Sequence, residues 1–223
     1  TAGGISSSKV MEMEPQVGSS YYCKLLIRVT SGWTSPCARP KLALKDADGA
    51  AISTNGNLEA TSDDGSASYN GDYPEFYFLR SNGNYTGEVD QIAIDAGAGN
   101  WVWTVGKFVV EGGTLGNIKF AQPYFFLDST NPGGGTFEVA FFQVYDHDPE
   151  GVSPAQAGRN LVDQTGATVS AITPTALTED FSHGLINRFT SRWSASQDLG
   201  GEESIVVDSS SPQGSYVLQL GNN

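Results

Sequence analysis

The chain has 223 residues, and its 12 Lys and Arg side chains are outnumbered by 25 Asp and Glu, so the net charge at pH 7 is −13. This balance argues against a protein that wraps nucleic acid or binds an anionic membrane, because either partner needs a basic surface. No stretch of the sequence approaches the roughly 18 apolar residues that a membrane-spanning helix requires. These properties fit a soluble protein of an acidic, extracellular setting.

Short stretches of alternating apolar and polar residues follow one another along the first two thirds of the chain. In YYCKLLIRV the odd positions from Tyr21 to Val29 are apolar, while Lys24 and Arg28 belong to the other side. A period of two is typical of a strand with one buried face. Turn residues separate the further strands that the sequence predicts, which are residues 42–44, 75–80, 90–95, 100–110, 117–127 and 136–146.

The strand predicted at residues 100–110 changes the phase of its pattern. Its apolar residues shift from Trp101, Trp103 and Val105 to Phe108 and Val110, with Gly106 at the change. A glycine at a change of phase predicts a β-bulge.

The pattern as a whole predicts an all-β protein. About eight strands with regular turn signals, and almost no helical periodicity, indicate a β-sandwich of the jelly-roll type for residues 1–148. Residues 149–177 are poor in aromatics and rich in small residues, which predicts a linker. Strand character returns in residues 178–223, which end on two alternating stretches that cannot bury their apolar sides alone.

Several segments resemble those of a known family. DFSHGL, the later Trp193 and GSYVLQLGN are similar to its opening strands, whereas VMEMEPQVGSSYYCKLLIRV, NWVWTVGKFVV and GTFEVAFFQVYD are similar to its later ones. The family is that of the jelly-roll carbohydrate-binding modules of the CBM4/9 and galactose-binding-like type. The resemblance implies a jelly-roll fold and binding of a sugar.

The order of these segments is inverted relative to the family. Three explanations are open: a piece of a tandem array cut inside one module at each end, strands lent to a neighbouring subunit, or strands folded back as in a circular permutant. We favour the tandem array. Residues 1–148 are then a module without its opening strands, and residues 178–223 are the opening part of a second, incomplete jelly roll.

The sequence carries no recognisable catalytic signature. Its two histidines, His147 and His183, lie in none of the usual hydrolase, zinc or phosphate-binding motifs. Carboxylates concentrate in turn sequences such as TSDDGS and DADG, where capping and solvation explain them. We therefore expect no catalysis and no cofactor.

Metal binding has three candidate positions. DADG resembles the front of a calcium loop but lacks the later ligands, so a hairpin turn explains it better. Asp146, His147 and Asp148 cluster at a strand end, where a charged boundary is the alternative to a metal. The family resemblance implies a structural calcium, for which Asp180 matches the opening ligand, while Ala140 to Phe142 stand where the closing ligand is expected.

Sugar binding requires aromatic platforms, because the C–H face of a pyranose packs on Trp or Tyr rings. Trp33 lies in the loop sequence SGWTSP and is the leading candidate. Tyr73 and Tyr85 lie among turn residues and are further candidates. Trp101 and Trp103 lie on an alternating strand, and the family position predicts that at least one of them belongs to the core.

The two cysteines leave a pairing open. Cys23 and Cys37 form a disulfide if the strand of one passes the loop of the other, whereas Cys23 also suits a core position.

These observations favour a non-catalytic module that recognises a surface glycan, as one unit of a multi-module chain such as a bacteriophage tail fibre or another adhesin. The alternatives are a structural spacer of a virion or cell surface, and an accessory module of a secreted polysaccharide-degrading enzyme. The expected partners are a surface polysaccharide and identical or neighbouring virion subunits, with no nucleic acid and no membrane insertion.

Overall fold

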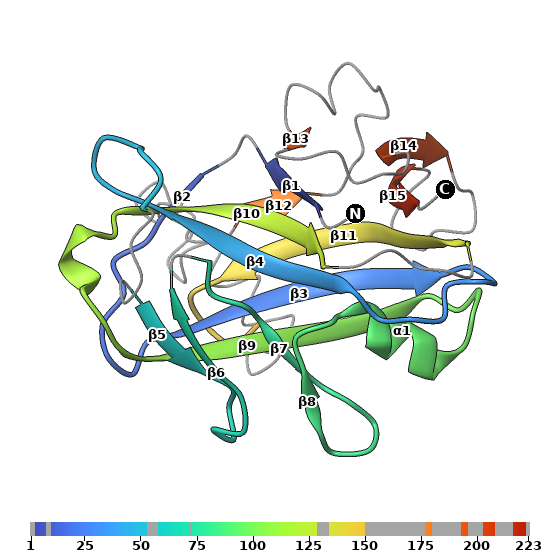
Figure 1. Cartoon of the computed structure of the whole chain (residues 1–223), viewed down its shortest axis with the longest axis horizontal. Coiled ribbons are helices and arrows are strands. Elements are labelled where there is room, and N and C mark those ends of the chain that lie inside the picture. The colour runs from blue at the N-terminus through green and yellow to red at the C-terminus, as the bar shows by residue number, and fades with distance from the viewer. Residues whose placement is uncertain are drawn as a thin grey trace, which may run out of the picture.

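The chain folds into two layered β-sheets with one short helix (Figure 1). The structure is a computed structural model. It describes residues 3–7, 10–52, 58–71, 73–128, 134–149, 177–179, 193–195, 203–207 and 216–221. Asp180 and most of the predicted linker lie outside these residues. No helix within the described ranges is long and apolar enough to cross a membrane.

The first sheet has five strands and is built around β10 (Phe120–Leu127). Along one edge β10 pairs over its whole length with β4 (Ala38–Lys45). Along the other edge it pairs with β1 (Gly3–Ser7) and β2 (Met11–Glu12), and β1 in turn pairs with β13 (Trp193–Ala195). All of these pairs are antiparallel.

The second sheet has ten strands and is built around β3 (Ser20–Val29). On its two sides lie β9 (Val102–Gly112) and β11 (Thr136–Tyr145), which Figure 1 shows running along the length of the molecule. Beyond β9 the sheet continues into β5 (Leu58–Thr61), β6 (Ser68–Gly71), β7 (Tyr77–Leu79) and β8 (Tyr85–Thr86).

The C-terminal strands join these same sheets. β12 (Leu177–Glu179) and β15 (Tyr216–Gly221) both pair with β11, and β14 (Glu203–Val207) pairs with β15. β13 pairs with β1, so the described C-terminal strands extend both sheets.

The core lies between the two sheets and is rich in phenylalanine. Phe125 of β10 contacts Phe137 and Phe142 of β11, at ring-centroid distances of 6.4 and 5.2 Å. These contacts join the two layers. The predicted inward residues of β3, from Tyr21 to Val29 at every second position, are all buried, which confirms the alternation. The all-β sandwich predicted from the sequence is therefore the observed fold.

The prediction of a strand at residues 90–95 was wrong, because this segment is the helix α1 (Asp90–Ala96). Its run Ile92, Ala93, Ile94 is too short for its period to distinguish a buried strand from a buried helix. The 3-10 turn η1 (Leu115–Asn117) is the other helical element of the described residues.

The predicted bulge at Gly106 was also wrong. The register of β9 against β3 is continuous from Val102 to Val109, so Trp103 and Lys107 share the outer side and Phe108 and Val110 the inner side. Gly106 instead gives space to a neighbour, since a Cβ there would lie 2.5 Å from ring atoms of Phe78. The register shift next to β3 lies in β11, between Val139 and Phe141.

Candidate functional site

Trp33, the leading sequence candidate, is a core residue. Its side chain is 3% exposed and packs on Phe137, with 6.2 Å between ring centroids. Its indole Nε1 donates a hydrogen bond of 2.7 Å to Asp90 Oδ2. A sugar platform needs an open ring face, and Trp33 does not present one in this structure.

Asp90 explains why the loop residue Trp33 turns inward. Its carboxylate also accepts hydrogen bonds from the backbone N–H groups of Cys37, at 2.9 Å, and Ala38, at 3.0 Å. Burial raises the pKa of Asp90 to about 6, and the hydrogen bonds from Trp33, Cys37 and Ala38 oppose that rise. This buried carboxylate ties the loop before β4 to the start of α1.

Tyr73 and Tyr85 lie in two other parts of the molecule. Tyr73 belongs to a segment beside β4, and its ring packs on Tyr124 with 5.4 Å between centroids. Tyr85 belongs to β8, packs partly against the core, and has a raised pKa because of burial and the nearby Asp63 and Asp64. The three predicted aromatic residues therefore do not form one cluster.

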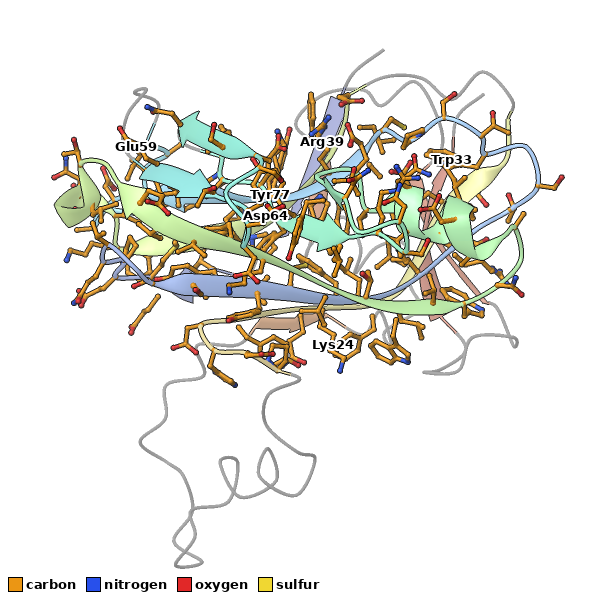
Figure 2. All side chains as sticks on the ribbon, turned by 90° about the horizontal axis from the view of Figure 1, so that it is seen from below. Lys24, Trp33, Arg39, Glu59, Asp64 and Tyr77 are labelled. Carbon is orange, nitrogen blue, oxygen red and sulfur yellow. The ribbon has the colours of Figure 1, made fainter. Side chains whose placement is uncertain are left out.

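The outer side of the ten-stranded sheet carries a different aromatic group, which we call the tryptophan face. It consists of outward residues of β9, β3 and β11 with Trp101 just before β9: Trp101, Trp103, Val105, Lys107, Tyr22, Lys24, Leu26, Arg28, Glu138, Phe141, Gln143 and Tyr145. Figure 2 shows Lys24 of this face and Arg39 on opposite sides of the sandwich.

Trp103 is the most exposed ring of the tryptophan face. Its side chain is 41% exposed. The other Phe, Tyr and Trp side chains that the structure describes are buried or half-buried. Phe141 packs edge-on against it with 5.2 Å between centroids. Beneath these rings Leu26 is 1% exposed, so the face has a small hydrophobic cluster of its own.

The register shift in β11 places Phe141 on this face. Val139 pairs with Ile27 and Phe141 with Leu26, so Ala140 is an extra residue between them. One extra residue reverses the side to which the following side chains point. Without it, Phe141 would point into the core and Phe142 would take its place outside.

Cations border the rings of the tryptophan face. Lys24 Nζ lies 5.3 Å from the centroid of Trp103, and Arg28 Cζ lies 4.6 Å from that of Trp101. Arg28 donates from Nε to Glu138 Oε2 at 2.7 Å, and Lys107 forms an ion pair with Asp63. Arg28 and Lys107 of this face are thus each paired with a carboxylate, on a chain whose net charge is −13.

The outer side of the five-stranded sheet carries a second aromatic group, the tyrosine face. It comprises Tyr73, Glu75, Arg39, Lys41, Ala43, Gln122, Tyr124 and Phe126. On β10 these side chains alternate with the buried Ala121, Pro123, Phe125 and Leu127.

The described residues do not fit the calcium site that the resemblance implies. At the closing-strand position Ala140 and Phe142 are buried and Phe141 packs on Trp103, so none of the three supplies a side-chain oxygen ligand. In the part of the chain that the structure describes, no three His, Cys, Asp or Glu side chains come together in a way that could hold a metal ion. The second ligand of the resemblance, Asp180, lies outside that part.

The DADG sequence forms a turn, which the sequence analysis preferred to a calcium loop. Asp46 Oδ1 accepts hydrogen bonds from the N–H groups of Asp48 and Ala50, at 3.0 and 2.9 Å. These bonds use the carboxylate to close the turn. At the other predicted cluster, His147 Nδ1 lies 2.8 Å from Asp146 Oδ1 at the surface.

A hollow of about 590 Å³ is lined by residues of neither aromatic face. It is an open, polar depression of the β5–β6 hairpin and β9, with Glu59, Asn70 and Glu111 in its lining. Its aromatic member, Tyr69, uses its hydroxyl to accept a 2.6 Å hydrogen bond from the N–H of Tyr73. The hollow thus offers carboxylates and an amide but no free ring face.

Comparison of the chain with protein-family models, with curated proteins and with solved structures finds no match.

Sequence reasoning missed Trp103 and Phe141 as surface residues. Trp103 could have been found from its spacing to Lys107. The two residues are an even number of positions apart, so a continuous strand places both side chains on the same side. The spacing of residues does not reveal the side to which Phe141 points, because the bulge at Ala140 reverses it.

Proposed function

We propose that this chain is a non-catalytic module for glycan recognition and adhesion, in which a sugar stacks on Trp103. The observation that carries the proposal is the 41% exposure of this indole on the outer side of a rigid sheet. Isolated exposed aliphatic residues are common at protein surfaces, whereas an exposed tryptophan supported by a second ring is a frequent feature of binding surfaces.

The chemistry around Trp103 suits a carbohydrate. The C–H face of a pyranose packs on an aromatic ring, and polar side chains next to the ring bond the hydroxyl groups. Lys24 and Gln143 are directly opposite each other on β3 and β11, in the row next to that of Trp103, Leu26 and Phe141. They supply an ammonium group and an amide within one strand row of the platform.

The position of the platform also indicates the shape of the ligand. Trp103 lies on the face of the sheet, and the two described hollows are lined by other residues. A broad face suits the middle of a polysaccharide or a densely glycosylated surface. Such contacts are individually weak, so repeated modules in one surface or virion adhesin would gain affinity by multivalency.

The tryptophan face also supports the structural alternative. Aromatic residues are enriched in the buried centres of protein–protein interfaces, so a neighbouring subunit is the other plausible cover for Trp103 and Phe141. A spacer module would then form a stable oligomer and bind no sugar. An accessory module of a secreted polysaccharide-degrading enzyme would bind through the same face as the adhesin.

The test is a glycan array that includes bacterial surface polysaccharides, probed with the wild type, Trp103→Phe and Trp103→Ala. We expect binding that Trp103→Ala weakens at least tenfold, the effect of losing about 1.4 kcal/mol or more at a central aromatic contact, and that Trp103→Phe partly retains. Val17→Ala is the control, since Val17 is 68% exposed in the turn before β3.

Two results would overturn the proposal. Glycan binding that Trp103→Ala leaves intact would remove Trp103 as the platform. Silence across the array, combined with a stable oligomer that Trp103→Ala dissociates in mass measurements, would assign the face to subunit packing.

A further inference from the structure

We infer that Asn82 is a site of spontaneous covalent modification, at which the fold favours deamidation of the side chain over the same reaction at Asn70. Both residues are followed by glycine, and in an Asn–Gly step no side chain shields the next backbone nitrogen. The co-reactant is water. The inference is independent of the proposed function, because the reaction requires no glycan.

Asn82 lies at the tip of the hairpin that joins β7 and β8, which projects from the body of the sandwich (Figure 1). Residues 81–84 are all exposed. The N–H of Gly83 donates to the carbonyl of Arg80 at 3.0 Å, and the N–H of Arg80 donates to the carbonyl of Asn84 at 2.9 Å. Gly83 has a φ of +85°, which glycine adopts without strain. The segment is therefore a tight turn that faces solvent.

The side chain of Asn82 is curled over the peptide unit that follows it. Its Oδ1 accepts a hydrogen bond of 3.0 Å from the N–H of Asn84, two residues further on. This Asx turn spans the peptide bond between Asn82 and Gly83, so the side-chain carbon Cγ lies over the backbone nitrogen that attacks it. The same hydrogen bond withdraws electron density from the carbonyl and makes Cγ more electrophilic.

The nitrogen of Gly83 becomes available at a small cost in free energy. No atom lies within 4 Å of a Cβ placed at Gly83, so no neighbouring segment packs against this part of the turn. When the hydrogen bond to the carbonyl of Arg80 opens, the N–H of Gly83 meets solvent, where base removes its proton. Exposed turns with few buried contacts are among the parts of a fold that open most readily.

The reaction has two balanced steps. The deprotonated nitrogen of Gly83 forms a bond to Asn82 Cγ, and the Cγ–Nδ2 bond breaks to release ammonia. The product is a five-membered succinimide. Water then adds across one of its two carbonyl–nitrogen bonds and leaves either aspartate or isoaspartate, so the chain gains one negative charge beyond its −13. Nothing is oxidised or reduced.

Asn70 is the internal comparison, because the fold holds the same dipeptide in a paired strand. It belongs to β6 and pairs with Glu59 of β5. Gly71, which would supply the nitrogen, is buried, and a Cβ there would lie 2.6 Å from the hydroxyl oxygen of Tyr69. Attack therefore requires that β5 and β6 separate first, which slows the reaction by the free energy of that opening. A third such step, Asn55–Gly56, lies outside the described residues.

The experiment incubates the whole chain at 37 °C in buffers of pH 6 and pH 8, with and without guanidinium chloride. Samples are digested under mildly acidic conditions. For each Asn–Gly peptide, mass spectrometry measures the fraction in which a hydroxyl group has replaced the amide –NH₂. Anion exchange of the intact protein follows the added charge. Asn82→Gln is the chemical control, because its longer side chain would have to close a less favourable six-membered ring, and Asn70→Gln is the matched change at the comparison site.

We expect the folded protein to convert Asn82 at least about tenfold faster than Asn70, because the strand pair must open before Asn70 reacts. The rate at Asn82 should rise from pH 6 to pH 8, since base removes the proton of Gly83. In guanidinium chloride both sites should react at similar rates. Asn82→Gln should lower the yield of the more acidic protein by the amount that its peptide contributes, whereas Asn70→Gln should leave this yield unchanged.

Two results would overturn the inference. Equal rates at Asn82 and Asn70 in the folded protein would show that the fold does not direct the reaction to the β7–β8 turn. Conversion of Asn82 in guanidinium chloride but not in the native protein would show that the turn protects this side chain from the backbone nitrogen of Gly83.

Discussion

Trp33 and Asp90 are 57 residues apart in the chain and meet through a buried hydrogen bond of 2.7 Å between Nε1 and Oδ2. The same carboxylate holds the backbone N–H groups of Cys37 and Ala38. One side chain thus fixes the loop after β3, the start of β4 and the beginning of α1. This contact converts a loop tryptophan, which the sequence offers as a ligand platform, into part of the core.

We predict that Asp90→Asn destabilises the protein by about 2–4 kcal/mol. The amide has one acceptor oxygen in place of two, and its N–H₂ group would face an N–H donor, so at least one buried donor loses its partner. Urea unfolding followed by circular dichroism measures the change. Asp95→Asn on the same helix is the matched control: Asp95 pairs with Arg80 at the surface, and its loss should cost less than about 1 kcal/mol. Equal effects of the two changes would contradict this account.

The same residue predicts how stability depends on pH. Burial raises the pKa of Asp90 from 3.8 to about 6 in the folded state, so the folded protein holds this proton more tightly than the unfolded chain. Protonation of Asp90 therefore stabilises the folded state. This stabilisation is fully present below pH 3.8 and is lost as the pH rises through 6. A difference of about two pKa units corresponds to about 3 kcal/mol.

The measurement is the difference in unfolding free energy between wild type and Asp90→Asn across pH 4 to 7.5. Other carboxylates titrate in both proteins and cancel in this difference. Because the wild type gains stability on acidification and the variant lacks this term, the variant's deficit should be larger near pH 4 than at pH 7. A deficit that stays constant with pH would show that Asp90 does not titrate in this range.

The sequence sufficed for the fold class because every long strand has one side in the core. In β3 every odd position from Tyr21 to Val29 is buried, as the alternation predicted. The segment 90–95 was misassigned because six residues are too few to establish a period. The pairing of the C-terminal strands with β1 and β11 depends on contacts across the whole chain, and alternation within a strand does not encode its neighbour.

The candidate sites were harder to predict, because exposure depends on partners distant in sequence. Trp33 was expected at the surface, but Asp90 draws it inward. At least one of Trp101 and Trp103 was expected in the core. The unbroken register of β9 turns Trp103 outward. Tyr73 is half-buried, and its ring partner Tyr124 becomes visible only when β10 and β4 are paired.

Gly106→Ala should destabilise the protein by about 1–3 kcal/mol. The added methyl group would lie 2.5 Å from ring atoms of Phe78, which is fully buried and has no space to move. Gly116→Ala is the control, because no atom lies within 4 Å of a Cβ at that position. Phe78→Leu should relieve part of the cost of Gly106→Ala in thermal unfolding. If the two changes are additive, the close approach of Phe78 to Gly106 is not the cause.

Cys23 and Cys37 should behave as two unreactive free thiols. Both are fully buried, and burial raises the pKa of the Cys23 thiol, which suppresses the thiolate that reacts. Ellman's reagent should detect almost no reactive thiol in native buffer. In denaturant without reductant it should detect two thiols per chain. Detection of none in denaturant, with two appearing only after reduction, would instead show a disulfide.

Arg28 and Glu138 should behave as a buried pair that supports the tryptophan face. Glu138 is 3% exposed, and Arg28 lies over the Trp101 ring while donating to Glu138 at 2.7 Å. Glu138→Ala leaves the half-enclosed guanidinium without its carboxylate and should lower the free energy of unfolding by about 3–5 kcal/mol. The double variant Arg28→Met/Glu138→Leu should lower it much less, because it removes both charges together. Denaturant unfolding of the two single variants, Arg28→Met and Glu138→Leu, and of the double variant measures their coupling. If the destabilisation by the double variant equals the sum of the two single effects, then Arg28 and Glu138 act independently and Trp101 owes its support to the hydrophobic cluster of Leu26 and Ala140.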